Sequence, residues 1–99
     1  MGISRRELEE IIEWTRSGSR RIRIRFKGYR YSVVIDRFVK AVDRQGRGVS
    51  WPTAFGTRSP YDTISSFRIE EVVLESGGQT ERFSSLRELL EYVRGSRTP

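Results

Sequence analysis

The sequence predicts an α+β domain in which one curved, mainly antiparallel sheet of four to five strands carries an N-terminal and a C-terminal helix on its apolar face. Three observations predict this fold. Apolar residues recur with helical spacing near both ends of the chain, a strictly alternating segment follows the first of them, and glycine-containing turns separate short β-prone runs in between. Helices at the ends and strands between them are typical of α+β proteins. At 99 residues we expect a single domain over residues 1–99, with an ordered core at about residues 4–94.

The two predicted helices begin with the same signal. Ser4 is followed three residues later by Glu7, which is the capping-box pattern, and apolar residues then recur with helical spacing over 5–16. Near the C-terminus, Ser85 and Glu88 repeat the capping box. The apolar stripe that follows consists of Leu86, Leu89, Leu90 and Val93. Each helix therefore has one apolar side with which to cover a sheet.

The segment at 20–27 is the clearest strand because apolar and cationic residues alternate along it without a break. A lysine-glycine pair at 27–28 predicts a tight two-residue turn, and a second strand is expected at 29–36. With that turn, Arg25 lies opposite Arg30 on the face that the helices leave open. The arginines expected to share this face are Arg21, Arg23, Arg25 and Arg30.

The remaining β-prone runs are shorter. We expect a third strand at 38–43, a short strand at 49–51, and at 64–75 a strand with a bulge near 70–71. The glycines at 77–78 then turn the chain into a last short strand. Five aromatic side chains are expected in the core beside the isoleucines of the first strand: Phe26, Tyr29, Tyr31, Phe38 and Phe67.

Residues 52–62 contain two prolines and a glycine, which predict an irregular loop. The loop holds Phe55 and Tyr61, follows Trp51 and carries Arg58. Proteins that bind single-stranded nucleic acid use such rings as platforms on which bases stack. Packing of the loop itself is the alternative use of these rings. A mobile aromatic loop beside the arginines would form a cleft.

Composition excludes several classes of site. The chain has neither histidine nor cysteine, so the commonest general bases, thiol nucleophiles and soft-metal ligands are missing. A GxxxxGK[ST] phosphate-binding loop and a Rossmann glycine fingerprint are also absent. We therefore expect a protein that is not an enzyme and that uses no metal and no cofactor.

The charge of the chain favours anionic partners. The formal net charge is +6, and because only Lys27 and Lys40 are lysines, 17 of the 19 cationic residues are arginines. Arginine binds phosphate through two parallel hydrogen bonds, so phosphate binding is one explanation for the excess of arginine. Genome composition or thermal adaptation is the alternative explanation. The scarcity of thermolabile residues predicts a thermophile. Without a long apolar segment, we expect a soluble cytoplasmic protein that does not enter membranes.

Three segments give the chain a layout that resembles the ThermoDBP-related single-stranded DNA-binding proteins of archaea. They lie within about residues 4–94 and read ISRRELEEII, RRIRIRFKGYRYSVVID and FSSLRELLEYV. The resemblance implies an apolar cleft, flanked by basic residues, that receives unstacked bases. It would assign these roles to Arg23, Arg25, Arg30, Trp51, Phe55 and Tyr61.

The function expected from these observations is binding of single-stranded DNA, or RNA, with little sequence preference. The expected contact residues are Arg21, Arg23, Arg25, Arg30, Trp51, Phe55, Arg58 and Tyr61. One alternative is a small ribonuclease resembling RelE-like toxins, in which arginine, lysine and tyrosine replace histidine. Another is a basic module that docks an acidic protein, or a homodimer built through the helix stripes. The arginines would lose their role if neighbouring strands neutralised them through Glu70, Glu71, Glu75 or Glu81.

Overall fold

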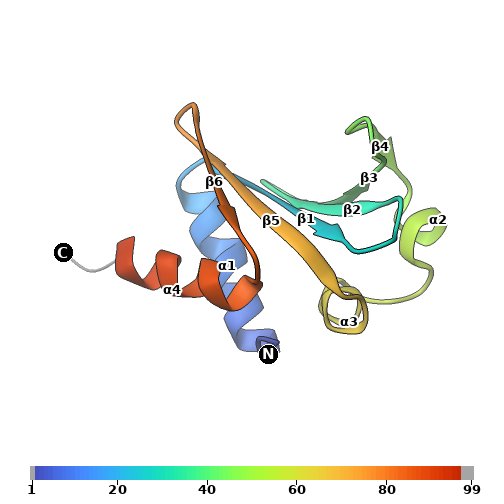
Figure 1. The fold of residues 1–99 in the computed structure, drawn as a ribbon, viewed down its shortest axis with the longest axis horizontal. Helices are drawn as coiled ribbons and strands as arrows, with labels where there is room; N and C mark the ends of the chain where they lie inside the picture. Colours follow the sequence, from blue (N-terminus) through green and yellow to red (C-terminus); the bar gives the residue numbers. More distant parts are fainter. Residues whose placement is uncertain (1, 97–99) are drawn as a thin grey trace.

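The computed structural model describes residues 2–96, and Figure 1 shows their path as a ribbon. The elements follow in the order α1 (Arg5–Ser17), β1 (Arg21–Phe26), β2 (Ser32–Ile35), β3 (Val39–Val42), β4 (Gly48–Val49), α2 (Trp51–Phe55), α3 (Pro60–Ser66), β5 (Ile69–Ser76), β6 (Gln79–Phe83) and α4 (Leu86–Ser96). The predicted α+β class is confirmed.

Within residues 2–96 the strands form a single six-stranded sheet in the order β4-β3-β2-β1-β5-β6. Every neighbouring pair is antiparallel, as predicted, although the sheet has six strands rather than four to five. The chain reaches β5 only after passing through α2 and α3, and β5 then pairs with β1 on the side away from β2. The alternating strand β1 therefore lies in the middle of the sheet.

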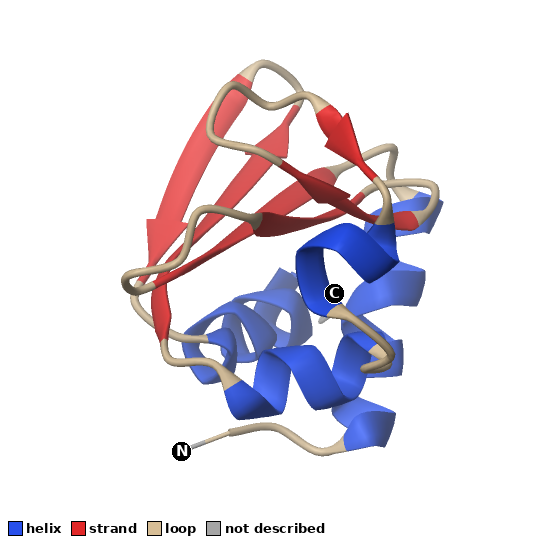
Figure 2. Ribbon diagram, turned by 90° about the vertical axis from the view of Figure 1, so that its right-hand side faces the viewer, coloured by secondary structure: helices blue, strands red, loops and turns tan. Residues whose placement is uncertain are grey.

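The helices lie on one face of the sheet and leave the other face open (Figure 2). Alternation along β1 sends Ile22 and Ile24 toward the helices, where neither has exposed surface. Helices α1 and α4 contribute Ile11 and Leu89 to the same core. Removal of this apolar surface from water is the main favourable term for folding. We call the side of the sheet opposite the helices the outer face.

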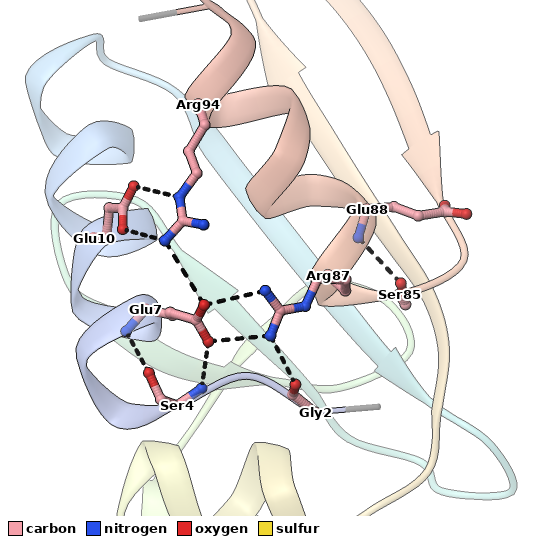
Figure 3. A network of polar contacts seen from close by, with 8 residues as sticks. All are labelled: Gly2, Ser4, Glu7, Glu10, Ser85, Arg87, Glu88 and Arg94. Atoms are coloured by element: carbon pink, nitrogen blue, oxygen red, sulfur yellow. Dashed lines mark hydrogen bonds and ion pairs between the residues drawn. The ribbon is translucent and has the colours of Figure 1, made fainter.

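Ion pairs join α1 to α4 along their seam (Figure 3). The predicted capping box is confirmed, because the Ser4 hydroxyl accepts a hydrogen bond from the Glu7 N–H and the Glu7 carboxylate accepts one from the Ser4 N–H. The same carboxylate lies 3.1 Å from Arg87 and 3.7 Å from Arg94, which also pairs with Glu10 at 3.2 Å. The Ser4 N–H and the Arg87 guanidinium lower the pKa of the Glu7 carboxyl.

The second predicted capping box differs from the ideal pattern by one residue. The Ser85 hydroxyl accepts from the Glu88 N–H at 3.2 Å, as expected. The Glu88 carboxylate accepts instead from the N–H of Ser84 at 2.9 Å. Side chains thus accept hydrogen bonds from two backbone N–H groups at the start of α4, close to the position that the sequence predicts.

The connection between β1 and β2 is longer than the predicted two-residue turn. Strand β1 ends at Phe26 and β2 begins at Ser32, so residues 27–31 form the connection. The register pairs Arg25 with Ser32 rather than with Arg30. Because the shift amounts to two residues, the paired residues of β1 and β2 stay on their predicted sides of the sheet, while residues 29–31 leave it.

Contacts made by distant residues hold this connection open. The Lys27 N–H donates to the carbonyl of Arg68 at 2.8 Å, which continues the pairing toward β5. The Tyr29 hydroxyl donates to the carbonyl of Ala54 in α2, and the Tyr29 ring packs against Phe55. A tight turn would forgo these contacts, so tertiary packing overrides the local turn signal.

Residues 52–62 belong mainly to the short helices α2 and α3 rather than to an irregular loop. The side chains of Ser50 and Ser59 cap them by accepting hydrogen bonds from backbone N–H groups of the first turn. Pro52 and Pro60 lie in that first turn, where a missing N–H leaves no helical hydrogen bond unmade. The prediction was wrong because it took the prolines as loop signals.

Strand β5 contains the predicted bulge. Arg25 of β1 pairs with Glu71 and Phe26 pairs with Ile69, so Glu70 is the extra residue. The bulge switches the side of the sheet to which successive residues point, as the change of apolar parity indicates. The strand begins later than expected, because the residues before it belong to α3 and its exit.

Candidate nucleic-acid interface

Strand β1 presents three arginines on the outer face. Arg21 and Arg25 are exposed and Arg23 is half-buried, and they alternate with the buried residues that face the helices. Arg30 follows in the connection to β2 and is exposed. All four arginines that the sequence assigns to this side of the molecule are thus present along β1 and at its hairpin end.

Arg23 is held between apolar residues of both neighbouring strands. Its partners in the register are Val34 on β2 and Val73 on β5. Val34 has no exposed surface although it points to the outer face, and Arg23 is its direct cross-strand neighbour there. The Nε–H of Arg23 is buried and has no hydrogen-bond partner within residues 2–96. The Arg23 guanidinium is therefore anchored by its stem while retaining unused hydrogen-bonding capacity.

Among the residues that the structure describes, only one of these four arginines forms an ion pair with a carboxylate. Arg25 pairs with Glu71 at 3.2 Å. In the described chain, no carboxylate oxygen lies within 4.0 Å of a guanidinium nitrogen of Arg21, Arg23 or Arg30. Of these arginines only Arg25 has an ion pair within residues 2–96, while Arg21 lies opposite Glu75 in the register and interacts electrostatically with Asp36 from beyond ion-pair distance.

Arginines surround a hollow of about 490 Å³ at the hairpin end of β1, which we call the hairpin hollow. The charged residues that line it are Arg23, Arg25, Arg30, Arg44 and Glu70. Four guanidinium groups and one carboxylate line the hollow, and even with Arg25 paired to Glu71 beside it the cations outnumber the carboxylates. The hydroxyl-bearing Ser32 also lines it. Such a lining suits anionic oxygens, which accept hydrogen bonds from guanidinium and hydroxyl groups.

Sequence reasoning did not single out Arg44. It lies in the turn between β3 and β4, where the Asp43 carboxylate accepts hydrogen bonds from the N–H groups of Gln45 and Arg47 at 2.9 Å each. The turn was expected, but only the strand order places it beside Arg30. We call Arg21, Arg23, Arg25, Arg30 and Arg44 the arginine face.

The aromatic residues expected to stack on bases lie on the helix side of the sheet. Phe55 is only 1% exposed, and its ring contacts those of Phe26 and Trp51 at centroid distances of 5.9 and 4.8 Å. The Trp51 indole N–H donates to the carbonyl of Arg58 at 2.7 Å. These contacts favour the alternative in which the rings pack within the segment, because Phe55 belongs to the core while Trp51 and Tyr61 are half-buried against it.

Arg58 and Tyr61 are likewise used within the helix layer. Arg58 donates to the carbonyl of Phe55 at 3.3 Å and lies 5.4 Å from the centre of the Phe67 ring. Tyr61 is half-buried, and the guanidinium of Arg5 lies 4.7 Å from its ring centre. Arg23, Arg25 and Arg30 thus line one hollow, and the lining of that hollow does not include Trp51, Phe55, Arg58 or Tyr61.

Comparison of the chain with protein-family models, with curated proteins and with solved structures found no match. No helix within residues 2–96 has the length and apolar character needed to span a membrane. The same residues contain no cluster of three or more potential metal-ligating side chains of the His, Cys, Asp and Glu types. The chemistry that the site offers is that of its arginines, which bind anionic oxygens.

Proposed function

We propose that the protein binds single-stranded nucleic acid, DNA in the first instance, with little sequence preference, through the arginine face. The observation that carries this proposal is the convergence of four arginines on the hairpin hollow with a single carboxylate among them. Arg21 extends the same positive charge along β1. A ligand with regularly spaced phosphates matches this arrangement.

The energetic argument rests on charge that the molecule does not neutralise itself. Guanidinium groups gathered on one face repel one another, and a polyanion relieves that repulsion while counterions leave its phosphates. Arginines kept for thermal stability would be expected in ion-pair networks, as in the α1–α4 seam. Those of the arginine face, apart from Arg25, have no such pair in the described chain.

Two features support a single strand with little sequence preference. Guanidinium groups on a pleated surface contact phosphates, which carry no base information. The helices of residues 2–96 lie on the opposite face (Figure 2), whereas readers of duplex sequence commonly place a helix in the major groove. A single strand of nucleic acid that crosses the sheet can contact the arginines without a helix inserted into a groove.

The proposal predicts a steep salt dependence. If about four or five phosphates are neutralised, the slope of log K against log salt should be about −3 on a single strand. Fluorescence anisotropy of a labelled oligothymidylate, titrated at increasing salt, measures this slope. A flat response, or no binding at low salt, would contradict the proposal.

Single charge removals locate the contact surface. Arg30→Gln and Arg44→Gln change exposed side chains, and each should reduce the magnitude of the slope by about 0.7 through the loss of one phosphate contact. Arg6→Gln is the matched control, because it removes the same charge from an exposed position on α1. Equal weakening by all three variants would show that net charge, rather than the arginine face, drives binding.

A further inference from the structure

Phe38 is exposed although the sequence analysis assigns it to the core. Strand β3 begins at Val39, so Phe38 lies in the turn that precedes it, and its side chain is 67% exposed. Within residues 2–96 no aromatic ring packs against it. The expectation of a core position was wrong, because the strand begins one residue later than predicted. The Phe38 ring is therefore exposed on the surface.

The turn holds the Phe38 backbone in place. The Asp36 carboxylate accepts from the Phe38 N–H at 3.0 Å, and the Asp36 N–H donates to the Phe38 carbonyl at 3.1 Å. Partial burial would raise the pKa of the Asp36 carboxyl, but the Phe38 N–H, the Lys40 ammonium and the more distant charge of Arg21 outweigh it and hold that pKa below its usual value. Asp36 therefore stays ionised and paired with Lys40 at 3.1 Å. The exposed ring thus lies in a turn whose backbone is held by hydrogen bonds.

Cationic side chains surround the ring. Phe38 lines a hollow of about 500 Å³, which we call the turn hollow, together with Arg16, Arg20, Arg21, Arg37, Lys40 and the paired carboxylate. Arg16 donates to the carbonyl of Arg37 at 3.1 Å, and Arg20 donates to that of Trp14 at 2.8 Å. Neutral carbonyl groups orient these two guanidinium groups without cancelling their charge. Five cations thus face one carboxylate around an exposed ring.

This combination matches a ligand that is planar and anionic at once. A nucleotide of a single strand offers a base face for the ring and phosphates for the cations. An anionic membrane is the competing partner, but insertion into lipid relies on several apolar side chains, and the turn hollow presents one large one. The surroundings of Phe38 therefore favour nucleic acid.

Strand β1 connects the turn hollow to the hairpin hollow. Arg21 lines the former, while Arg23 and Arg25 line the latter. The six residues of β1 span about 20 Å at roughly 3.3 Å per residue. A stacked strand rises about 3.4 Å per nucleotide, so about six nucleotides, or fewer if unstacked, bridge the two hollows.

We propose that Phe38 stacks on a base of a bound single strand, that Arg21 and Arg37 bind the phosphates beside it, and that the strand runs along β1 to the hairpin hollow. This assignment rests on the function proposed above and adds to it a base-stacking site and a path. It also separates single strands from duplexes, because a duplex keeps its base faces stacked on each other.

The decisive variant is Phe38→Ala. Binding of an oligothymidylate of about ten nucleotides should weaken roughly 5- to 150-fold, the range that stacking platforms show on alanine substitution. Phe38→Tyr keeps a ring and should bind like the unaltered protein. Binding of a duplex of the same length and of heparin should not change. The side chain is exposed, so thermal unfolding of Phe38→Ala should match that of the unaltered protein.

The outcomes separate this inference from the proposed function. If the unaltered protein binds the oligonucleotide with the expected salt dependence but Phe38→Ala binds it equally well, the stacking site is refuted and the arginine face stands. If Phe38→Ala weakens the binding of the oligonucleotide, the duplex and heparin to the same extent, the ring does not contact a base. If the unaltered protein does not bind the oligonucleotide at low salt, the proposed function itself fails.

Two further measurements test the path and the partner. Affinity should rise with oligonucleotide length up to about six nucleotides and then change little, because that length reaches both hollows. A steady rise without a step, or saturation at one or two nucleotides, would overturn the path along β1. Sedimentation with vesicles of phosphatidylcholine and phosphatidylserine should show no binding that depends on Phe38, and Phe38-dependent binding would assign the turn to a membrane instead.

Discussion

Arginines occupy two regions of this molecule under opposite electrostatic conditions. In the α1–α4 seam, Arg87 lies 3.1 Å from Glu7 and Arg94 lies 3.2 Å from Glu10 (Figure 3). On the arginine face, Arg25 has one such contact, while the described chain offers the other members no carboxylate within 4.0 Å. The first region resembles a structural tie between two helices, and the second is charged surface left open.

The difference shows that, within residues 2–96, arginines of one small domain occur both in ion pairs between helices and on an open surface without such pairs. Composition alone leaves thermal adaptation and phosphate binding as competing explanations for the 17 arginines. The location of each arginine distinguishes these explanations, because paired arginines join elements together and unpaired ones remain available to a partner. Variants on the helix side should therefore affect stability, and variants on the outer face should affect binding.

The largest expected effect concerns the helix side. Phe55→Ala removes a ring with 1% exposure from the core and should lower the free energy of unfolding by about 3–5 kcal/mol. Urea denaturation followed by circular dichroism measures the change. The comparison between the two regions predicts no change in the salt slope of oligonucleotide binding while the variant remains folded.

A milder substitution guards against complete unfolding. Phe55→Leu keeps an apolar side chain and should fold with a smaller loss of stability than Phe55→Ala. If Phe55→Leu were fully stable yet bound oligonucleotide several-fold less tightly, Phe55 would have to contact the ligand. The division between a structural helix side and a binding outer face would then be untenable.

A smaller effect would sharpen the comparison at Arg25. Glu71→Gln removes the carboxylate that pairs with Arg25 at 3.2 Å and lies 3.7 Å from Arg82. Oligonucleotide affinity should rise a few-fold and the magnitude of the salt slope by about 0.7, since one more cation becomes available to phosphate. Anisotropy titrations beside Glu13→Gln, an exposed carboxylate on α1, provide the test. Unchanged or weaker binding of Glu71→Gln would show that Arg25 does not meet the ligand.

The smallest effect concerns the seam and its pH dependence. The folded-state pKa of Glu7 is lowered from 4.5, so its contribution to stability is present above that pH and is lost as the pH falls through the folded-state pKa. Glu7→Gln should therefore lower Tm at neutral pH and flatten the decline of Tm below pH 4.5. Thermal unfolding across this range, with Glu9→Gln as an exposed control on α1, measures the difference. Parallel Tm profiles for the Glu7 variant and the unaltered protein would exclude a structural role for the pair.

Local patterns in the sequence were sufficient for much of the fold. Helical spacing and capping residues predicted α1 and α4, and alternation predicted β1 and the side to which each of its arginines points. The change of apolar parity near Glu70 predicted the bulge in β5. These features depend on neighbours within one or two turns or along a single strand, so the chain specifies them before it folds.

Other features depended on which distant segments meet. Phe55 is buried because α2 packs against Phe26 of β1, and the β1–β2 connection widened because Tyr29 reaches the same helix. Arg44 joins the arginine face through the strand order, and Phe38 is exposed because β3 begins one residue after it. Periodicity in a sequence determines the side of an element on which a residue lies. Only tertiary packing decides what covers that side, because the free energies of burial and pairing are shared among residues far apart in the chain.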